Sequence, residues 1–320
     1  MFDLVSIGEI LVDLTPAGAG PGGRLLYQAN PGGAPANVAC AAAKFGLKTA
    51  FIGAVGGDAF GRLCLASLKA AEVETAYMAI RPGRATTLAA VSLDETGDRS
   101  FAFYRGGTAD LDLSPEELPA GLGRLTRALH FGSLSLSAEP ARTATLKAAK
   151  EVRAAGGLVS FDPNYRDLIW PSPAEARKHI EAAAPLAQVL KLSREDGHVL
   201  FGPGEPEDIL RRAGGEFGNP LIIVTLAETG CLAAFGGQVL AAPAFKLPVM
   251  DTTGAGDAFV GGLLKGLLAR DRLDDFTSAE MADALVFANA AGSLTVTKRG
   301  AISALPDLDE VKRLKACPWS

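Results

Sequence analysis

The chain contains few of the side chains that commonly build metal sites. Four cysteines and three histidines occur among its 320 residues, and no two cysteines form a C-x-x-C pair. They are spread along the sequence: Cys40, Cys64, Cys231 and Cys317, with His130, His179 and His198. Cys40 and Cys64 lie among alanines and leucines, where a thiol packs as a small apolar side chain. The sequence therefore predicts no zinc or haem site.

Positive charge is also scarce. The chain has 31 Lys and Arg against 36 Asp and Glu, a formal net charge of −5 and a pI near 5.4. No run of basic residues interrupts this balance, and binding to a polyanion needs a basic patch. Nucleic acid is therefore excluded as an expected partner.

A long uncharged apolar run is missing from the start of the chain. The opening residues, MFDLVSIGEILVDL, are apolar but include Asp3, Glu9 and Asp13. Neither a signal peptide nor a transmembrane helix tolerates charges at this density. We expect a buried first strand, a cytoplasmic location and no membrane partner.

The remaining composition is that of a folded α/β protein. Hydrophobic residues make up 48% of the chain, enough for a sizeable core, and short β-branched runs alternate with alanine-rich helical patterns. This alternation is typical of a mainly parallel sheet covered by helices on both faces. Strands are predicted over 4–12, 49–55, 128–131, 158–162, 189–192 and 221–226, and helices over 35–45, 60–71, 139–155 and 174–184.

Two stretches break the alternation. Residues 15–31 are polar and rich in Gly and Pro, and residues 85–104 are typical of a β-hairpin with its turn at 95–98. Insertions of this kind at one end of an α/β sheet can form a lid over a site at the strand ends. We therefore expect one domain over residues 1–320, with a lid built from about 13–31 and 85–110 inserted in it.

The segment from Asp251 to Phe259, DTTGAGDAF, predicts an anion site. Its small residues allow the backbone to turn tightly into a helix, whose first N–H groups lack partners within the helix. A carboxylate at Asp257 would be repelled by a bound phosphate, unless it accepts the proton of a hydroxyl that attacks the phosphate. The alternative is that Asp257 only caps the helix and complements its dipole.

Other nucleotide motifs fit less well. A dinucleotide fingerprint requires a third glycine two positions before Gly261, and no segment has the Lys-Ser/Thr pair of a Walker A loop.

A second informative segment, NPGGAPANVA, runs from Asn30 to Ala39. Its paired glycines let a polyol approach the backbone, and Asn37 can donate to and accept from vicinal hydroxyls. Taken alone, this segment is an ordinary loop before a helix.

Together, the two segments resemble the signature motifs of the ribokinase-like (PfkB) family of carbohydrate kinases, in the same order. The resemblance covers essentially the whole chain and includes DPNYR from Asp162 and KRGA from Lys298. NPGGAPAN, DTTG and HFGS from His130 are most similar to bacterial fructokinases. The sister alternative is a 2-keto-3-deoxygluconate kinase, which would use Tyr104, Arg105 and Arg166 to hold a carboxylate.

The resemblance implies a three-layer α/β/α fold with a small β-sheet lid, and transfer of the γ-phosphate of Mg-ATP to a primary sugar hydroxyl, most simply that of fructose. Asp257 would be the base, and the N–H groups of Gly254, Ala255 and Gly256 would form the anion hole. The implied sugar-site residues are Asp13, Gly32, Gly33, Asn37, Arg105, Asn164 and Arg166. The implied nucleotide-site residues are Lys191, Ser193, Thr225, Ala227, Gly230, Gly254, Gly256 and Asn289.

Three positions depart from the family pattern. Ser193 replaces the asparagine of N-x-x-E, so Asp196 would hold Mg²⁺ through water, and Ala227 replaces a glycine. Ala304 replaces a serine that ribokinases often place near a monovalent cation, so potassium at Asp251 and Thr253 stays an open alternative. The exposed edge of the lid predicts a homodimer formed through it.

Simpler interpretations of individual residues also stay open. Arg105 could be a solvated edge charge, Asp13 could start a turn, Arg166 could pair with Asp167 or a helix end, and Lys191 could be a surface charge. A non-catalytic sugar sensor would have lost the acid or the anion hole, and both are intact in the sequence. A nicotinamide-dependent dehydrogenase would require a glycine fingerprint after the first strand, where Gly8-Glu9-Ile10-Leu11 offers none.

Overall fold

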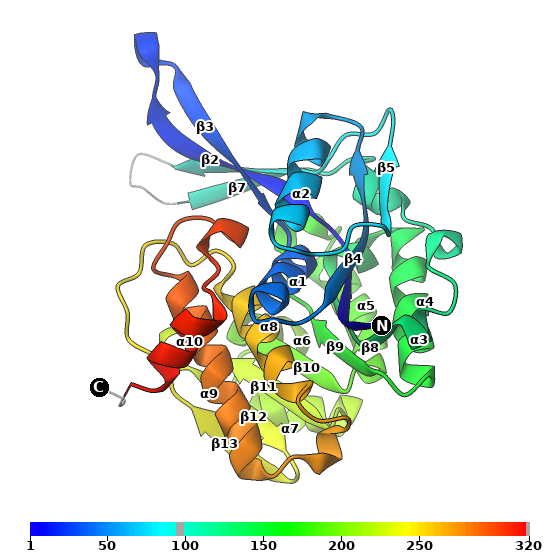
Figure 1. Cartoon of the computed structure of the whole chain (residues 1–320), viewed down its shortest axis with the longest axis vertical. Helices are drawn as coiled ribbons and strands as arrows, with labels where there is room; N and C mark the ends of the chain where they lie inside the picture. The colour runs from blue at the N-terminus through cyan, green and yellow to red at the C-terminus, as the bar shows by residue number, and fades with distance from the viewer. Residues whose placement is uncertain (94–98, 318–320) are drawn as a thin grey trace.

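A computed structural model describes residues 1–93 and 99–317, with a nine-stranded sheet at its centre (Figure 1). The strand order is β13-β12-β11-β10-β9-β8-β1-β4-β5, parallel from β11 to β5 and antiparallel at β12 and β13. The strands are β1 (Phe2–Ile7), β4 (Thr49–Gly56), β5 (Met78–Arg81), β8 (Thr126–Gly132), β9 (Leu158–Asp162), β10 (Val189–Ser193), β11 (Leu221–Thr225), β12 (Cys231–Phe235) and β13 (Gln238–Ala242).

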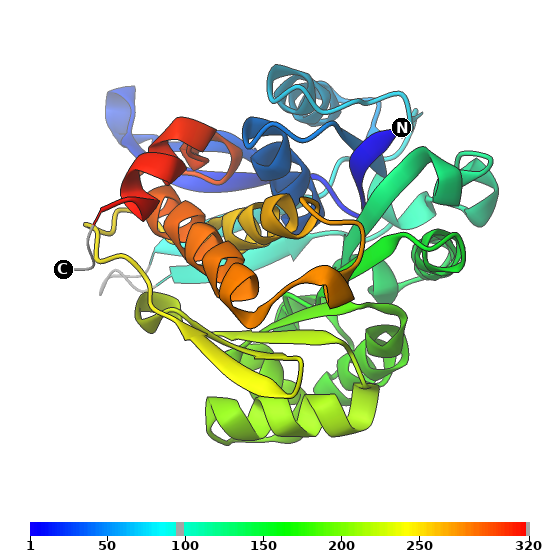
Figure 2. The same cartoon turned by 60° about the horizontal axis from the view of Figure 1, so that its bottom comes forward.

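Helices cover both faces of this sheet (Figure 2). One face carries α1 (Ala34–Lys44), α2 (Ala59–Ala70), α8 (Ala255–Leu267) and α9 (Ser278–Thr295), with α10 (Leu308–Lys315) against α9. The other carries α3 (Leu122–Leu125), α4 (Ala141–Ala154), α5 (Pro173–Ala183), α6 (Arg194–Phe201) and α7 (Pro206–Phe217). The predicted three-layer α/β/α fold is thereby confirmed.

The strands are continuous apolar runs because both of their faces are buried. Ile222 and Val224 of β11 pack in the core under α4–α7, whereas Leu221 and Ile223 pack under α8 and α9. Alternate side chains of a strand point to opposite faces, so a strand covered on both sides needs apolar residues at every position. This is why the predicted strands after the first agree with the observed ones to within a few residues.

The predicted strand over 4–12 is wrong as a single element. The chain forms β1, turns through residues 8–10, and begins β2 (Leu11–Ala19) in a different sheet. Gly8 has φ +148°, and a Cβ there would lie 2.8 Å from Cγ of Pro35. Glycine adopts this backbone conformation readily, and its missing Cβ leaves room for Pro35 at the start of α1. The strand therefore ends at Gly8.

A second, smaller sheet lies beyond the carboxyl end of β1 (Figure 1). Its order is β3-β2-β6-β7, with β3 (Leu25–Gly32), β6 (Leu88–Leu93) and β7 (Arg99–Tyr104). The pairs β2–β3 and β6–β7 are antiparallel, which confirms the hairpin predicted over 85–104, and β2 pairs with β6 in parallel. The predicted turn at 95–98 lies outside the described residues. We refer to these four strands as the small sheet.

Among the residues that the structure describes, no helix has both the length and the apolar character needed to cross a membrane.

Candidate functional site

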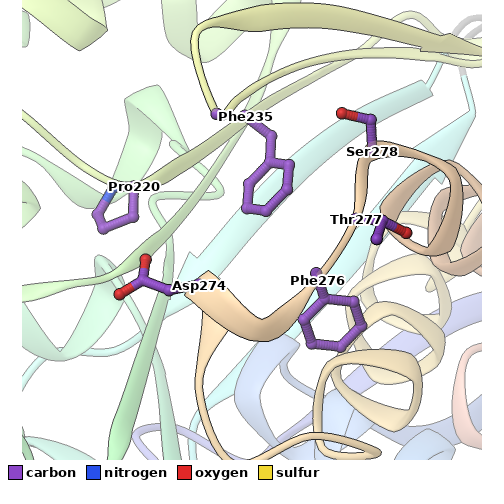
Figure 3. A pocket seen from close by; sticks show the side chains of 7 residues that line it. Pro220, Phe235, Asp274, Phe276, Thr277 and Ser278 are labelled. Carbon is purple, nitrogen blue, oxygen red and sulfur yellow. The ribbon is translucent and has the colours of Figure 1, made fainter.

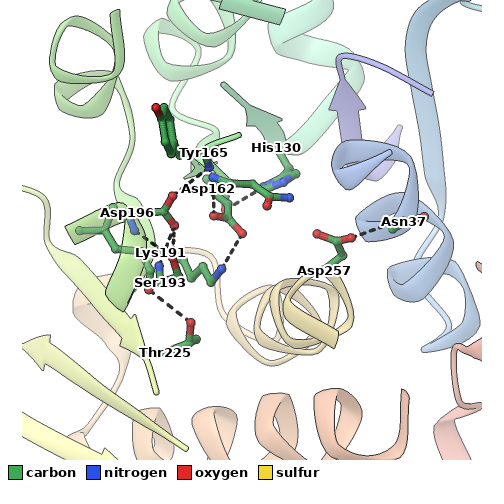
Figure 4. A network of polar contacts seen from close by, with 12 residues as sticks. Asn37, His130, Asp162, Tyr165, Lys191, Ser193, Asp196, Thr225 and Asp257 are labelled. Atoms are coloured by element: carbon green, nitrogen blue, oxygen red, sulfur yellow. Dashed lines mark hydrogen bonds and ion pairs between the residues drawn. The ribbon is translucent and has the colours of Figure 1, made fainter. Parts of the chain in front are cut away.

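The polar residues predicted for the site meet at the carboxyl ends of the parallel strands, facing the start of α8 (Figure 4). Asp162, Ser193 and Thr225 are the last residues of β9, β10 and β11. Open parallel sheets bind their ligands at this edge. The topology therefore assembles one site from segments that are far apart in the sequence.

Gly254 shapes the start of α8. It is the N-terminal cap of the helix with φ +79°, and a Cβ on it would lie 3.1 Å from Cα of Ala301. The Ala255 N–H donates to Thr252 O over a long 3.3 Å, which closes the turn into the helix. The N–H groups of Gly256 and Asp257, in the first turn, have no acceptor within an α-helix. The result is a helix N-terminus suited to an anion.

Asp257 lies in this first turn with 7% of its surface exposed. Its Oδ2 accepts a hydrogen bond from Nδ2 of Asn37 over 2.7 Å. Burial raises the pKa of Asp257, while the Asn37 hydrogen bond and the charges of Lys191 and Arg166 oppose that rise. A carboxylate that is poorly hydrated and held beside an anion site is suited to accept a proton.

Lys191 of β10 forms a buried ion pair with Asp162 (Figure 4). Its Nζ lies 2.9 Å from Asp162 Oδ2, and a Cβ on Gly256 would lie only 3.5 Å from the same Nζ. Burial opposes the charge of Lys191, but Asp162 and Asp196 outweigh burial and raise the pKa of the ammonium. The interpretation of Lys191 as a surface charge is wrong, because it is a buried cation at the start of α8.

Asp196 connects three segments of the chain. Its Oδ2 accepts from both N–H and Oγ of Ser193 at 2.8 Å, which forms the N-terminal capping box of α6. Its Oδ1 accepts from the N–H of Tyr165 over 2.9 Å. The carboxylate is 3% exposed and oriented by these bonds. The loop after β9 and the start of α6 are thereby held together beside Lys191.

On the proposed sugar side, Asp13 lies over the paired glycines. A Cβ on Gly32 would lie 2.9 Å from Asp13 Oδ2, and one on Gly33, whose φ is +108°, would lie 2.7 Å from Glu9 O. Burial raises the pKa of Asp13 to about 6; the charge of Arg166 lowers it, and Asp257 raises it further. Asp13 belongs to β2 of the small sheet, so the alternative that it merely starts a turn is wrong.

Arg105 follows β7 and is buried, with 8% of its side chain exposed. Its Nε donates to Asp110 Oδ2 over 2.8 Å, Nη1 to Ser137 Oγ over 2.7 Å, and Nη2 to Leu134 O over 3.0 Å. The alternative of a solvated edge charge is therefore wrong. The guanidinium joins the base of the small sheet to the main sheet's loops, with its charge balanced by Asp110.

Arg166 and Asn164 lie in the loop after β9. Arg166 is exposed, donates from Nη1 to Tyr165 O over 2.9 Å, and lowers the pKa values of Asp13 and Asp257. The N–H of Asn164 donates to Asp162 Oδ1 over 3.1 Å, and its φ is +43°. Both residues are therefore in the loop that borders the site beside Asp162.

Three of the predicted nucleotide-site residues surround the end of β11. Thr225 ends the strand, Ala227 has φ +49°, and Gly230 has φ +108° with Ala242 O only 2.1 Å from the position of a Cβ. Ala227 is in the left-handed conformation, which glycine adopts more readily than alanine. Asn289 of α9 is buried and donates from Nδ2 to Ala242 O over 2.8 Å. Its amide thus fastens α9 to β13.

The candidate monovalent-cation residues form a compact turn before α8. Asp251 Oδ1 accepts from N–H and Oγ1 of Thr253 at 3.1 and 2.7 Å, and Oδ2 accepts from the N–H of Gly300 over 3.0 Å. Ala304, four residues after Gly300 in the sequence, is fully buried. The turn connects the segment before α8 to the loop after α9.

Sequence reasoning assigned no role to Glu9, Asp110 or Asp162. Glu9 is 2% exposed, and its Oε2 has no hydrogen-bond partner within residues 1–93 and 99–317. Burial raises the pKa of Glu9 to about 7, against the charge of Arg105 and with the help of Asp110 and Asp257. Asp162 belongs to a segment that carries the family resemblance, but nothing in the sequence shows that the charge of Asp162 or of Glu9 is buried.

Glu9→Gln is expected to stabilise the protein at pH 8 but not at pH 4.5. Because the pKa of Glu9 rises from 4.5 to about 7 on folding, its ionisation costs stability progressively as the pH rises through that range. The difference between the folded and unfolded pKa values of Glu9 corresponds to about 3 kcal/mol in the free energy of unfolding. Glutamine does not ionise, so the variant avoids this cost. Urea unfolding of both proteins across this range measures the effect. An equal difference at all pH values would contradict it.

One surface cavity is separate from this site (Figure 3). It has a volume of about 510 Å³ and is lined by Pro220, Phe235, Asp274, Phe276, Thr277 and Ser278 among others. Pro220 precedes β11, so the cavity lies at the strand end opposite to Thr225. It contains none of the residues predicted for catalysis or binding.

Comparison with known proteins finds relatives along nearly the whole chain. A fructokinase of Klebsiella pneumoniae is 41% identical over 308 residues, which cover 96% of this chain and 97% of that protein. The solved structure of a Vibrio cholerae fructokinase with fructose, ADP and calcium ion bound is 36% identical, has a TM-score of 0.86 and covers 98% of both chains. A double mutant of that enzyme was solved with fructose, ADP and potassium ion.

A neighbouring specificity also shares the fold. The aminoimidazole riboside kinase of Salmonella enterica, solved with aminoimidazole riboside and an ATP analogue, is 31% identical with a TM-score of 0.85, covering 98% of this chain and 100% of that one. The pfkB family carbohydrate kinase model matches residues 1–308. The chain therefore belongs to the pfkB family of carbohydrate kinases, which are phosphotransferases.

Proposed function

We propose that this protein transfers the γ-phosphate of ATP to the 6-hydroxyl of D-fructose, giving fructose 6-phosphate and ADP. The observation that carries the proposal is the placement of buried Asp257 in the first turn of α8, beside N–H groups that have no acceptor within the helix and near Lys191. A proton acceptor and a phosphate site thus meet at the carboxyl edge of the sheet. The fructokinases among its relatives support the choice of sugar.

In the proposed reaction, Asp257 accepts the proton of the sugar hydroxyl as its oxygen bonds to the γ-phosphorus. The bond from that phosphorus to the β,γ-bridging oxygen breaks, and ADP leaves. The N–H groups at the start of α8 and the ammonium of Lys191 hold the negative charge on the transferred group. Because the transition state is loose, positioning and these charges supply most of the catalysis.

The donor groups suit magnesium as the metal of the reaction. Within residues 1–93 and 99–317, no group of three or more His, Cys, Asp or Glu could hold a metal ion alone. Mg²⁺ commonly keeps several waters and binds through one or two carboxylates and the substrate's phosphates. Asp196 would hold it through water and, when bound, the ion would neutralise phosphate charge. Asp251 and Thr253 are our proposed ligands of a monovalent cation, in line with the potassium-bound relative.

The remaining residues of the site take matching roles in the proposal. Asp13, Gly32, Gly33, Arg105, Asn164 and Arg166 would surround the sugar, and Ser193, Thr225, Ala227, Gly230 and Asn289 would form the nucleotide side. The small sheet would close over the sugar and exclude water, a competing phosphate acceptor. Leu25, Leu26, Tyr27 and Tyr104 are exposed on it, which supports a homodimer formed through this sheet.

The charges favour a neutral sugar over a sugar acid. The guanidinium of Arg105 is already paired with Asp110, which leaves Arg166 to attract a substrate carboxylate, while Asp13 and Asp257 repel it when they are ionised. We therefore expect fructose to be phosphorylated with a kcat/KM at least about tenfold above that of 2-keto-3-deoxygluconate, a difference of about 1.4 kcal/mol.

A coupled assay of ADP release with fructose, 2-keto-3-deoxygluconate, ribose and aminoimidazole riboside measures this order directly. The riboside is the second candidate, because a kinase acting on it shares the fold at a TM-score of 0.85. Faster turnover of the keto acid than of fructose would contradict the proposed substrate. Faster turnover of the riboside would reassign the sugar site while leaving Asp257 as the base.

A further inference from the structure

Helix α8, which carries Asp257, and the alanine-rich helix α1 touch through two matched pairs of residues. Asp257 and Gly261 are about one turn apart on α8, and Asn37 and Ala41 are about one turn apart on α1. Residues with this spacing share a face of a helix. Asn37 bonds to Asp257, and a Cβ on Gly261 would lie 2.7 Å from Cβ of Ala41.

Gly261 sets how closely the two helices approach. A Cβ there would also lie 3.2 Å from Ala42 N and 3.3 Å from Val38 O, both backbone atoms of α1. Backbone atoms cannot turn aside as a flexible side chain can, so any side chain at Gly261 would push α1 away from α8. This glycine fits no dinucleotide motif, and the close helix contact accounts for it instead.

The hydrogen bond between Asn37 and Asp257 is short and buried. Nδ2 of Asn37 donates over 2.7 Å to Oδ2, and the two residues are 4% and 7% exposed. An ionised carboxylate has no proton to donate, so the donor must be the amide N–H. Oδ1 of Asn37 has no hydrogen-bond partner in the described part of the chain. The amide thus gives a donor to Asp257 and keeps an acceptor for a sugar hydroxyl.

We propose that Asn37 is a positioning residue for Asp257, and that Gly261 brings α1 close enough for it to act. The proposal rests on the function proposed above for Asp257. By holding Oδ2, Asn37 fixes the rotation of the carboxylate and leaves Oδ1 to take the hydroxyl's proton. A contact to the sugar alone would not require the α1–α8 distance that Gly261 provides.

The other charges around Asp257 set the size of the expected effect. Lys191 of β10 and Arg166 after β9 favour the carboxylate, whereas Glu9 before β2, Asp13 of β2 and Asp162 of β9 disfavour it. Burial raises the pKa of Asp257, and the Asn37 hydrogen bond opposes that rise more strongly than either cation does. Losing this donor should therefore move the ionisation of Asp257 to higher pH.

The test is the pH profile of kcat/KM for Asn37→Ala and Gly261→Ala. Losing a hydrogen bond to a charged group should move the acid limb of this profile, which reports the ionisation of Asp257, by roughly one to two pH units towards higher pH. Asn37→Ala should show this shift and regain activity at high pH. Asn37→Asp keeps the size of the side chain but adds a second carboxylate, so its shift should be larger. Gly261→Ala should shift the same limb, although it adds no group near the sugar.

Gly266→Ala is the matched control. It adds a Cβ 2.8 Å from Cβ of Ala284, on the same helix but against α9, and should leave the limb in place. A raised sugar KM with an unmoved limb in Asn37→Ala would overturn the proposal and leave a sugar contact only. If Gly261→Ala does not fold, the two Asn37 variants decide. Wild-type turnover by Asp257→Asn would instead overturn the proposed base.

Discussion

Asp257→Asn is expected to lower kcat by about 10²–10⁴-fold, while KM for the sugar and for ATP changes only a few-fold. The amide has nearly the shape of the carboxylate but cannot accept the proton of the attacking hydroxyl. Binding and the anion site at the start of α8 depend on backbone groups and Lys191, which the substitution leaves in place. Steady-state kinetics at several pH values measure both quantities.

The competing interpretation, a carboxylate that only caps α8, predicts the opposite pattern. A cap contributes about 0.5–2 kcal/mol to stability and nothing to kcat. Burial raises the pKa of Asp257, so its ionised form costs folding stability, and Asp257→Asn should leave the urea midpoint unchanged or higher rather than lower. Asp307→Ala is the control for the loss of a cap, because Asp307 caps α10 by accepting from the Glu310 N–H and lies outside the site, and alanine cannot accept this bond. Retained kcat in Asp257→Asn would leave the capping interpretation standing.

The regular elements were predictable because their signals are local. A strand buried on both faces must be apolar throughout, and the helices between strands keep their own period, so β4, β8, β9, β10 and β11 follow from the sequence. The break at Gly8 did not follow. Apart from Glu9, apolar residues lie on both sides of it, and the position of Pro35 beside it shows why the chain must turn.

The site was predictable in its motifs but not in its charge pairs. The glycine-rich segments indicate from their own sequence the two sides of the site that we propose. Lys191 and Asp162, by contrast, meet because β9 and β10 are neighbours in a parallel sheet, and Arg105 meets Asp110 inside the base of the small sheet. Pairing and burial of this kind depend on the tertiary arrangement, so a sequence pattern leaves such residues open to interpretation as surface charges.

The buried pair of Lys191 and Asp162 leads to the second large effect. Asp162→Ala removes the carboxylate and leaves the Lys191 ammonium, a residue only 5% exposed, without its closest partner. Breaking such a pair by removing one member costs about 3–5 kcal/mol. Asp196 is the next carboxylate, but both of its oxygens already accept N–H groups. We therefore expect urea unfolding to show that Asp162→Ala lowers the free energy of unfolding by most of this amount, about 3 kcal/mol.

Removing Lys191, the other member of the pair, should lower the free energy of unfolding by less. Burial raises the pKa of Asp162 to about 6 even with Lys191 present, so in Lys191→Met the acid can take up a proton near neutral pH for about 1.4 kcal/mol or less. The double variant Asp162→Leu with Lys191→Met should approach wild-type stability, since no unpaired charge remains.

The exposed pair of Asp208 and Arg211 provides the control, because Arg211→Ala should cost at most about 1 kcal/mol. A loss in Asp162→Ala no greater than in Arg211→Ala would mean that water reaches Lys191 and that its ammonium needs no partner. The ammonium would then lack the poorly hydrated setting in which we propose that it holds the phosphate. Lys191→Met should in any case lose ATP turnover while keeping most of its stability, which separates the lysine's proposed catalytic part from its part in folding.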